Sequence, residues 1–188
     1  MQIETQEIAV RLEANPLLQP GCISPLDPGM VVECILNPGV FRFGGKTWML
    51  LRVAERPVQK EGVVSLPVVN QYGGVEILEF DKNDPELDAT DSRVIRYRGQ
   101  DYLTTLSHLR LVCSENGIDF QEVPGYGAIS GLGELESFGI EDCRVTEIWG
   151  TYHLTYTMVS PLGVGVGLIT TQDWKNFERK GMIFPPHN

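Results

Sequence analysis

Hydrophobic and polar residues alternate in short runs along most of this chain, and glycine-rich or acidic segments separate the runs. Such alternation predicts half-buried β-strands. Three segments repeat one pattern, in which a short strand, a glycine-centred turn and a second strand follow one another. They are residues 37–51, 91–105 and 142–156, and their starts lie 54 and 51 residues apart. The pattern predicts three hairpins, each part of a larger repeated β unit.

A polar residue opens each hairpin at the same aligned position: Asn37, Asp91 and Asp142. Repeated β units of this kind are typical of β-propellers, in which the first residues of the innermost strands face a shared central channel. The sequence therefore predicts an all-β fold, an incomplete β-propeller of about three blades that begin near residues 37, 91 and 142. We expect the three polar side chains to point toward one axis.

The remaining segments are assigned around these hairpins. Residues 1–29 are expected to form an N-terminal arm that holds any helix in its first twenty residues, and residues 30–188 the partial propeller. Residues 63–80 are expected to supply outer strands of the first blade. Residues 114–120 are echoed 57 positions later by 171–177, so both should end a strand in the same way. Six aligned aliphatic residues should be buried between blades: Val40, Leu50, Val94, Leu103, Val145 and Leu154.

Composition narrows the classes of function. The formal net charge of −10 argues against nucleic acid or an anionic membrane as partner, since both require basic surface, but it does not exclude a small anion such as phosphate. The N-terminus has no signal-peptide pattern, and the four cysteines show no disulfide or metal spacing, so we expect free thiols in the cytoplasm and no metal site. Because three blades leave open edges, the chain is expected to be part of a longer protein or a homo-oligomer.

Asp142 is the strongest candidate for chemistry. It lies in the sequence Glu141-Asp142-Cys143-Arg144, where nearby charges can shift a carboxyl pKa. Neighbouring strand residues point to opposite faces, so Asp142 and Arg144 should share a face that excludes Glu141. The alternative is that the polar residues opening each repeat only cap turns.

Several motifs resemble glycoside hydrolase family 130. They are Asn37-Pro38-Gly39, Leu51-Arg52-Val53, Asp91-Ser92-Arg93-Val94, Ser107-His108-Leu109-Arg110-Leu111, Glu141-Asp142-x-Arg144-Val145 and Phe177-Glu178-Arg179. This family contains β-mannoside phosphorylases and β-1,2-mannosidases built on five-bladed β-propellers, and the resemblance covers about residues 30–188.

The resemblance implies that Asp142 is the general acid, that Asn37 and Arg52 contact the sugar, and that Arg144 flanks the acid. We extend the substrate-binding set to Asp91 and Arg93. Cys143 stands where the family usually has proline. For Arg52 and Arg144, an ion pair with a neighbouring blade is the structural alternative.

The implied reaction is cleavage of a β-mannoside oligosaccharide with inversion, most simply phosphorolysis to mannose 1-phosphate with inorganic phosphate as co-substrate and no cofactor. The phosphate ligands are expected from later blades. The alternatives are a hydrolytic β-1,2-mannosidase, a truncated or inactive sugar-binding propeller, and a propeller that binds a protein. A protein-binding scaffold has no special need for the polar column, so the column argues against the last class.

Overall fold

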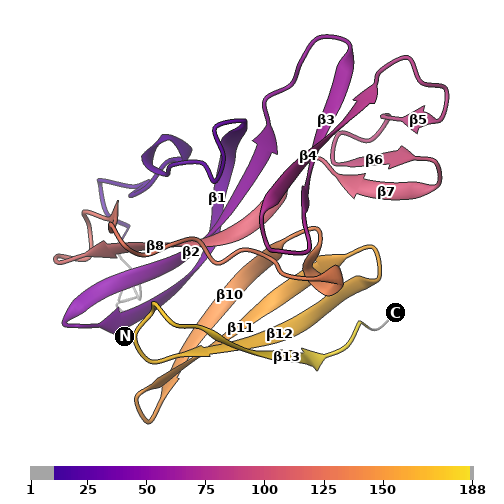
Figure 1. The fold of residues 1–188 in the computed structure, drawn as a ribbon. Helices are drawn as coiled ribbons and strands as arrows, with labels where there is room; N and C mark the ends of the chain where they lie inside the picture. Colours follow the sequence, from indigo (N-terminus) through magenta and orange to yellow (C-terminus); the bar gives the residue numbers. More distant parts are fainter. Residues whose placement is uncertain (1–10, 187–188) are drawn as a thin grey trace, which may run out of the picture.

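A computed structural model describes residues 11–186 of the chain (Figure 1). Its ordered elements are strands together with two 3-10 turns, η1 (Pro20–Cys22) and η2 (Glu134–Glu136), so the predicted all-β class is confirmed. Residues 11–19 form no helix, and residues 1–10 lie outside the described part. Within that part, no helix is long and apolar enough to cross a membrane.

The first four-stranded sheet is antiparallel throughout, with its strands in the order β1-β2-β8-β9. Its strands are β1 (Met30–Phe43), β2 (Lys46–Pro57), β8 (Leu106–Ser114) and β9 (Gln121–Glu122). The turn between β1 and β2 is Gly44-Gly45, and both residues have positive φ angles of 57° and 78°. Glycine adopts such angles without steric cost, which explains the tight reversal.

The second four-stranded sheet has the order β10-β11-β12-β13 and follows the chain directly. Its strands are β10 (Ile140–Ile148), β11 (Thr151–Ser160), β12 (Gly163–Thr171) and β13 (Glu178–Phe184). A deep apolar layer separates it from the first sheet. In β11, every second residue from Tyr152 to Ser160 is buried, as expected for a strand with one covered face.

Two small sheets lie between β2 and β8 in the sequence and project from the first sheet (Figure 1). β3 (Val63–Val69) pairs with β4 (Val75–Asp81), and β5 (Leu87–Asp88), β6 (Val94–Tyr97) and β7 (Gln100–Leu103) form a three-stranded sheet. The structure therefore differs from the expected pairing. Residues 63–80 add no strand to the first sheet, and residues 91–105 do not open a four-stranded unit. A hairpin forms from local turn chemistry alone, whereas the sheet it joins depends on long-range packing.

The predicted repeat is present, but its two units are the four-stranded sheets, β1-β2-β8-β9 and β10-β11-β12-β13, and the hairpin at residues 91–105 is not one of them. β1 and β10 are aligned at a spacing of 105 residues, whereas Ser114 and Thr171, which end β8 and β12, keep the predicted spacing of 57. Both hydroxyls accept hydrogen bonds from backbone amides of the following turn, those of Gly117 and Trp174. The predicted equivalence of these two strand ends is therefore confirmed.

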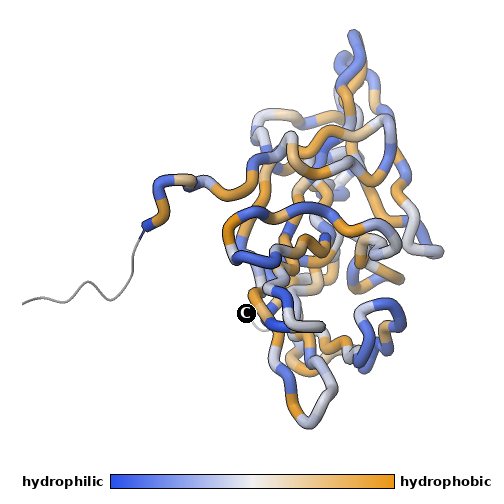
Figure 2. The backbone as a smooth tube through the Cα atoms, turned by 90° about the vertical axis from the view of Figure 1, so that its left-hand side faces the viewer, coloured by the Kyte–Doolittle hydropathy of each residue, from blue (hydrophilic) through white to orange (hydrophobic). Residues whose placement is uncertain are grey.

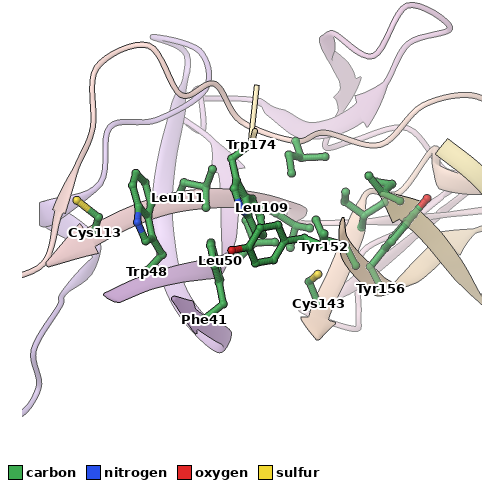
Figure 3. Close-up of a cluster of buried hydrophobic side chains, with 14 of the residues drawn as sticks. Phe41, Trp48, Leu50, Leu109, Leu111, Cys113, Cys143, Tyr152, Tyr156 and Trp174 are labelled. Carbon is green, nitrogen blue, oxygen red and sulfur yellow. The ribbon is translucent and has the colours of Figure 1, made fainter. Parts of the chain in front are cut away.

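The main core lies between the two four-stranded sheets and is rich in aromatic residues (Figure 3). The rings of Phe41 and Trp174 stack with centroids 3.9 Å apart, and Tyr152 packs against both. Leu50 and Leu154 are fully buried in this layer, as predicted. Coloured by hydropathy, the chain shows short apolar stretches interrupted by polar ones rather than one long apolar run (Figure 2).

The prediction that Val40 is buried is wrong, since 56% of this residue is exposed. A bulge between Leu36 and Gly39 in β1 shifts the alternation by one residue, so Phe41 turns toward the core instead. Val94, Leu103 and Val145 are only half-buried. The first two belong to the small projecting sheet, which has no large core to cover them.

Candidate functional site

Two matching bulges build the site. In β1 the register shifts between Leu36 and Gly39, and in β10 it shifts between Glu141 and Arg144. In each bulge two residues lie opposite one residue of the neighbouring strand, and Asn37 and Asp142 are the first of these two. Both have positive φ angles, of 35° and 48°. Asn and Asp tolerate this left-handed conformation better than other non-glycine residues. The repeated Asn and Asp therefore mark equivalent backbone kinks, and bulges of this kind re-aim side chains.

The two bulges pack against each other. A Cβ atom placed on Gly39 would lie 2.9 Å from the carbonyl oxygen of Cys143, closer than real Cβ atoms come. Only glycine permits this approach, and the approach brings β1 beside β10. As a result the Asn37 side chain lies near the carboxyl group of Asp142 and helps to lower its pKa. The structure thus brings together two of the three aligned polar residues.

Arg52, on β2, is the centre of the cluster. Its Nη1 lies 3.1 Å from Asp142 Oδ1, and its Nη2 lies 2.7 Å from Glu141 Oε1. Its Nε donates to Ser107 Oγ on β8, at 3.1 Å. The Arg52 side chain is 19% exposed, so these contacts are partly shielded from water. Strands from both four-stranded sheets thus meet at one guanidinium group.

The expectation that Glu141 is excluded from the face of Asp142 is wrong. Both carboxylates contact Arg52, because the bulge at Asp142 interrupts the strict alternation of the strand. Sequence reasoning treated β10 as a regular strand and therefore missed Glu141 as a site residue. It also gave Ser107 no role in the site, although Ser107 lies in one of the family-like motifs. The signal for the bulge was the Pro38-Gly39 pair that follows Asn37, the residue aligned with Asp142, because proline or glycine inside a strand often marks a bulge.

The pKa of the Asp142 carboxyl is lowered from its ordinary value. Burial raises it, but the hydrogen bonds from Asn37 and Arg52 and the positive charges of Arg52 and Arg144 outweigh burial. The side chain is 35% exposed, so it reaches solvent while paired. Asp142 is therefore ionised at neutral pH when nothing is bound.

A second close approach fixes the start of β10. Gly139 has a φ of 99°, and a Cβ atom on it would lie 2.3 Å from the carbonyl oxygen of Ser107. Ser107 and Gly139 also form an isolated parallel bridge between the two sheets. This contact sets the position of the two carboxylates that follow Gly139 in sequence.

The flanking residues have different environments. Arg144 is exposed and donates from Nη1 to the carbonyl oxygen of its neighbour Cys143, at 3.3 Å. The Cys143 side chain is fully buried in the main core (Figure 3), and burial raises the pKa of its thiol to about 12. An un-ionised, buried thiol is a packing group rather than a nucleophile.

Asp91 and Arg93 lie apart from this cluster. Asp91 accepts a hydrogen bond from the backbone amide of Arg93, and the Arg93 side chain is 87% exposed. They precede β6, whose small sheet projects away from β10 (Figure 1), and among the described residues no hydrogen bond or ion pair joins either of them to Asn37, Arg52 or Asp142. Asp91 therefore caps a turn, which is the alternative role that the sequence left open for the polar residues that open each repeat.

Two further buried acidic clusters serve other parts of the structure. Glu55 pairs with His108 at 2.7 Å on the opposite face of the first sheet. Glu55 also accepts a hydrogen bond from the backbone amide of Leu26, and this bond holds the N-terminal segment against the sheet. Glu136 binds Tyr156 and Arg179 beside the connector that leads into β10. Among residues 11–186, no cluster of His, Cys, Asp and Glu has the arrangement of a metal site.

Comparison with known proteins places this site in context. The chain is 39% identical over 186 residues to β-1,2-mannobiose phosphorylase from Listeria innocua serovar 6a, which covers 95% of this chain and 52% of that protein. The structure of the Listeria innocua enzyme in complex with β-1,2-mannobiose superimposes with a TM-score of 0.82, at 38% identity over 94% of this chain and 51% of the other. The resemblance to glycoside hydrolase family 130 is confirmed. No family model matches the chain.

More distant structures share the fold. One comes from the GH130 family of mannoside phosphorylases, described as containing hydrolases that target β-1,2-mannosidic linkages in Candida mannan, and has a TM-score of 0.57 at 18% identity. The match covers 93% of this chain and 40% of the other. A glycosyl hydrolase from Bacteroides ovatus has the same TM-score of 0.57, at 16% identity over 93% of this chain and 40% of the other. The chain spans about half the length of the curated relative it matches.

Proposed function

We propose that this chain forms the acid-bearing part of a β-mannoside phosphorylase, built as part of a five-bladed β-propeller, with Asp142 as the general acid. The observation that carries the proposal is the convergence of Asn37 and Arg52, both from the β1–β2 hairpin, on the partly exposed carboxyl group of Asp142, which lies 90 residues beyond Arg52 in the sequence. The relative that is 39% identical is a β-1,2-mannobiose phosphorylase, which supports a β-1,2-linked mannoside as substrate.

In the proposed reaction Asp142 gives a proton to the glycosidic oxygen as the bond from that oxygen to the anomeric carbon breaks. An oxygen of inorganic phosphate forms the new bond on the opposite face, which yields mannose 1-phosphate with inversion and frees the second sugar. Phosphate arrives already anionic, so no residue has to activate it. A hydrolase needs a second carboxylate to activate water.

The paired state of Asp142 fits the end of this step better than its start. Arg52 stabilises the carboxylate that remains after proton transfer, which makes Asp142 a stronger acid. The same pairing leaves little of the protonated form at neutral pH. Binding of a sugar and of anionic phosphate expels water and adds negative charge, and both effects raise the pKa of Asp142 toward the value an acid catalyst requires.

The test is incubation of this chain joined to the remaining blades with β-1,2-mannobiose, with and without inorganic phosphate, followed by assay for mannose 1-phosphate and free mannose. Phosphate-dependent formation of mannose 1-phosphate supports the proposal. Mannose released equally without phosphate indicates a mannosidase, and calorimetric binding without turnover indicates a sugar-binding module. Absence of both binding and turnover contradicts the proposal.

A further inference from the structure

The three nitrogens of the Arg52 guanidinium each have a different partner. Nη1 faces Asp142, Nη2 faces Glu141 and Nε faces Ser107. The contact with Glu141 is the shorter of the two ion pairs, at 2.7 Å against 3.1 Å. Glu141 is also the less exposed acid, at 20% against 35%. Shielding strengthens an ion pair, so Glu141 is the stronger anchor of Arg52.

Ser107 contacts both Arg52 and Glu141, so these three side chains form a closed triangle of hydrogen bonds. Its hydroxyl accepts from Arg52 Nε and donates to Glu141 Oε1 at 3.2 Å, the oxygen that also binds Arg52 Nη2. Both roles of the hydroxyl are thereby used, and Ser107 is only 2% exposed. Its backbone is fixed in turn by the close approach of Gly139. None of these contacts involves Asp142.

We propose that Glu141 and Ser107 are positioning residues that hold the Arg52 guanidinium in place while Asp142 changes between its charged and neutral forms. This inference rests on the proposed function of Asp142, since only an acid catalyst has to lose and regain a proton. Without the triangle, Arg52 would have Asp142 as its sole carboxylate partner and would be released each time that group became neutral. Arginine is suited to this arrangement because its planar group serves several acceptors at fixed angles.

The triangle also predicts in which direction the titration midpoint of the Asp142 carboxyl group moves when Glu141 loses its charge. Glu141 shares Arg52 with Asp142 and places a second negative charge beside it. In Glu141→Gln the shape is kept, the repulsion disappears and Arg52 serves Asp142 alone. The midpoint of the Asp142 carboxyl titration, followed by carbon NMR with Asp142→Asn as the assignment reference, should therefore fall by at least about half a pH unit. Glu147→Gln, which removes a carboxylate that accepts the Gly150 amide at the far end of β10, should leave it unchanged.

A loosened site would instead move the midpoint upward, toward the ordinary value for aspartic acid. An unchanged or raised midpoint in folded Glu141→Gln therefore overturns the proposal. The amide NMR spectrum of the same sample establishes that the variant is folded. Should Glu141→Gln not fold, Ser107→Ala provides the second variant, and it should speed solvent exchange of the Arg52 Nε proton.

The holding role has its own readout in that Nε proton. Asp142→Asn mimics the neutral acid, and the Arg52 signal should keep its position and its slow exchange with solvent. In the double variant Asp142→Asn, Glu141→Gln the signal should broaden and exchange at least about tenfold faster, since both carboxylate partners are gone. Loss of the signal in Asp142→Asn alone refutes the holding role. Neither measurement needs turnover, so failure of the catalytic proposal would leave these results interpretable on their own.

Discussion

Replacing Arg179 by methionine should destabilise the protein by leaving Glu136 buried without its counter-ion. The Glu136 side chain is 3% exposed, and it accepts hydrogen bonds from Tyr156 Oη at 2.6 Å and from the Leu132 amide at 2.8 Å. Removing one partner of a buried pair typically costs about 3–5 kcal/mol. We expect the lower end, about 3 kcal/mol, because two donors to Glu136 remain and methionine retains the aliphatic stem.

For a chain of this length, that loss corresponds to a fall in Tm of about 6–12 °C. Chemical and thermal denaturation followed by circular dichroism measure it. The matched control is Lys180→Met, the next residue of β13, whose ion pair with Glu178 is exposed and should contribute less than about 1 kcal/mol. Adding Glu136→Gln to Arg179→Met should recover part of the loss, because the buried charge is then gone. If Arg179→Met costs no more than the control, the buried-charge reasoning is refuted.

Three further predictions concern other parts of the molecule. Gly139→Ala should destabilise the fold by more than about 2 kcal/mol and broaden the Asp142 signal, since its Cβ would overlap the Ser107 carbonyl; equal stability to wild type in denaturant would contradict this. Backbone amides of Asn176 and Lys175 lower the pKa of Asp173 to about 2, so its stabilising effect is full above about pH 4 and disappears as the pH falls toward 2. Comparing the acid limb of stability with that of Asp173→Asn checks this, and identical limbs would count against it. Finally, apolar side chains on the outer face of the second sheet, including Phe184, should cause concentration-dependent association in analytical ultracentrifugation, which a monomer at all concentrations would rule out.

Local patterns allowed the strands and hairpins to be predicted, but not the way the sheets are assembled. Residues 91–105 form the predicted hairpin, yet β8 rather than that hairpin completes the first four-stranded sheet. Turn glycines and alternation act over a few residues, whereas the pairing of β2 with β8 joins segments separated by the whole projecting insertion. Nothing in a short repeat encodes that long-range choice.

The candidate site was predictable in part for the same reason. Asn37, Arg52 and Asp142 could be named from the family-like motifs, and the structure brings them together. Glu141 was assigned to the wrong face because a bulge breaks the two-residue period that the assignment assumed. The position of Asp91 could not be predicted either, since its role depends on which sheet its hairpin joins.

The most direct test of the account is Asp142→Asn in a version that carries the remaining blades, measured on phosphate-dependent cleavage of β-1,2-mannobiose. Asparagine keeps the shape and hydrogen-bonding capacity of the side chain but cannot donate the catalytic proton. General acid catalysis contributes about 10²–10⁴-fold, so turnover should fall at least about 100-fold while sugar binding by calorimetry changes little. Asp91→Asn, in the projecting sheet, should remain near wild type. Near-normal turnover in Asp142→Asn, with loss of activity in Asp91→Asn, would contradict the assignment.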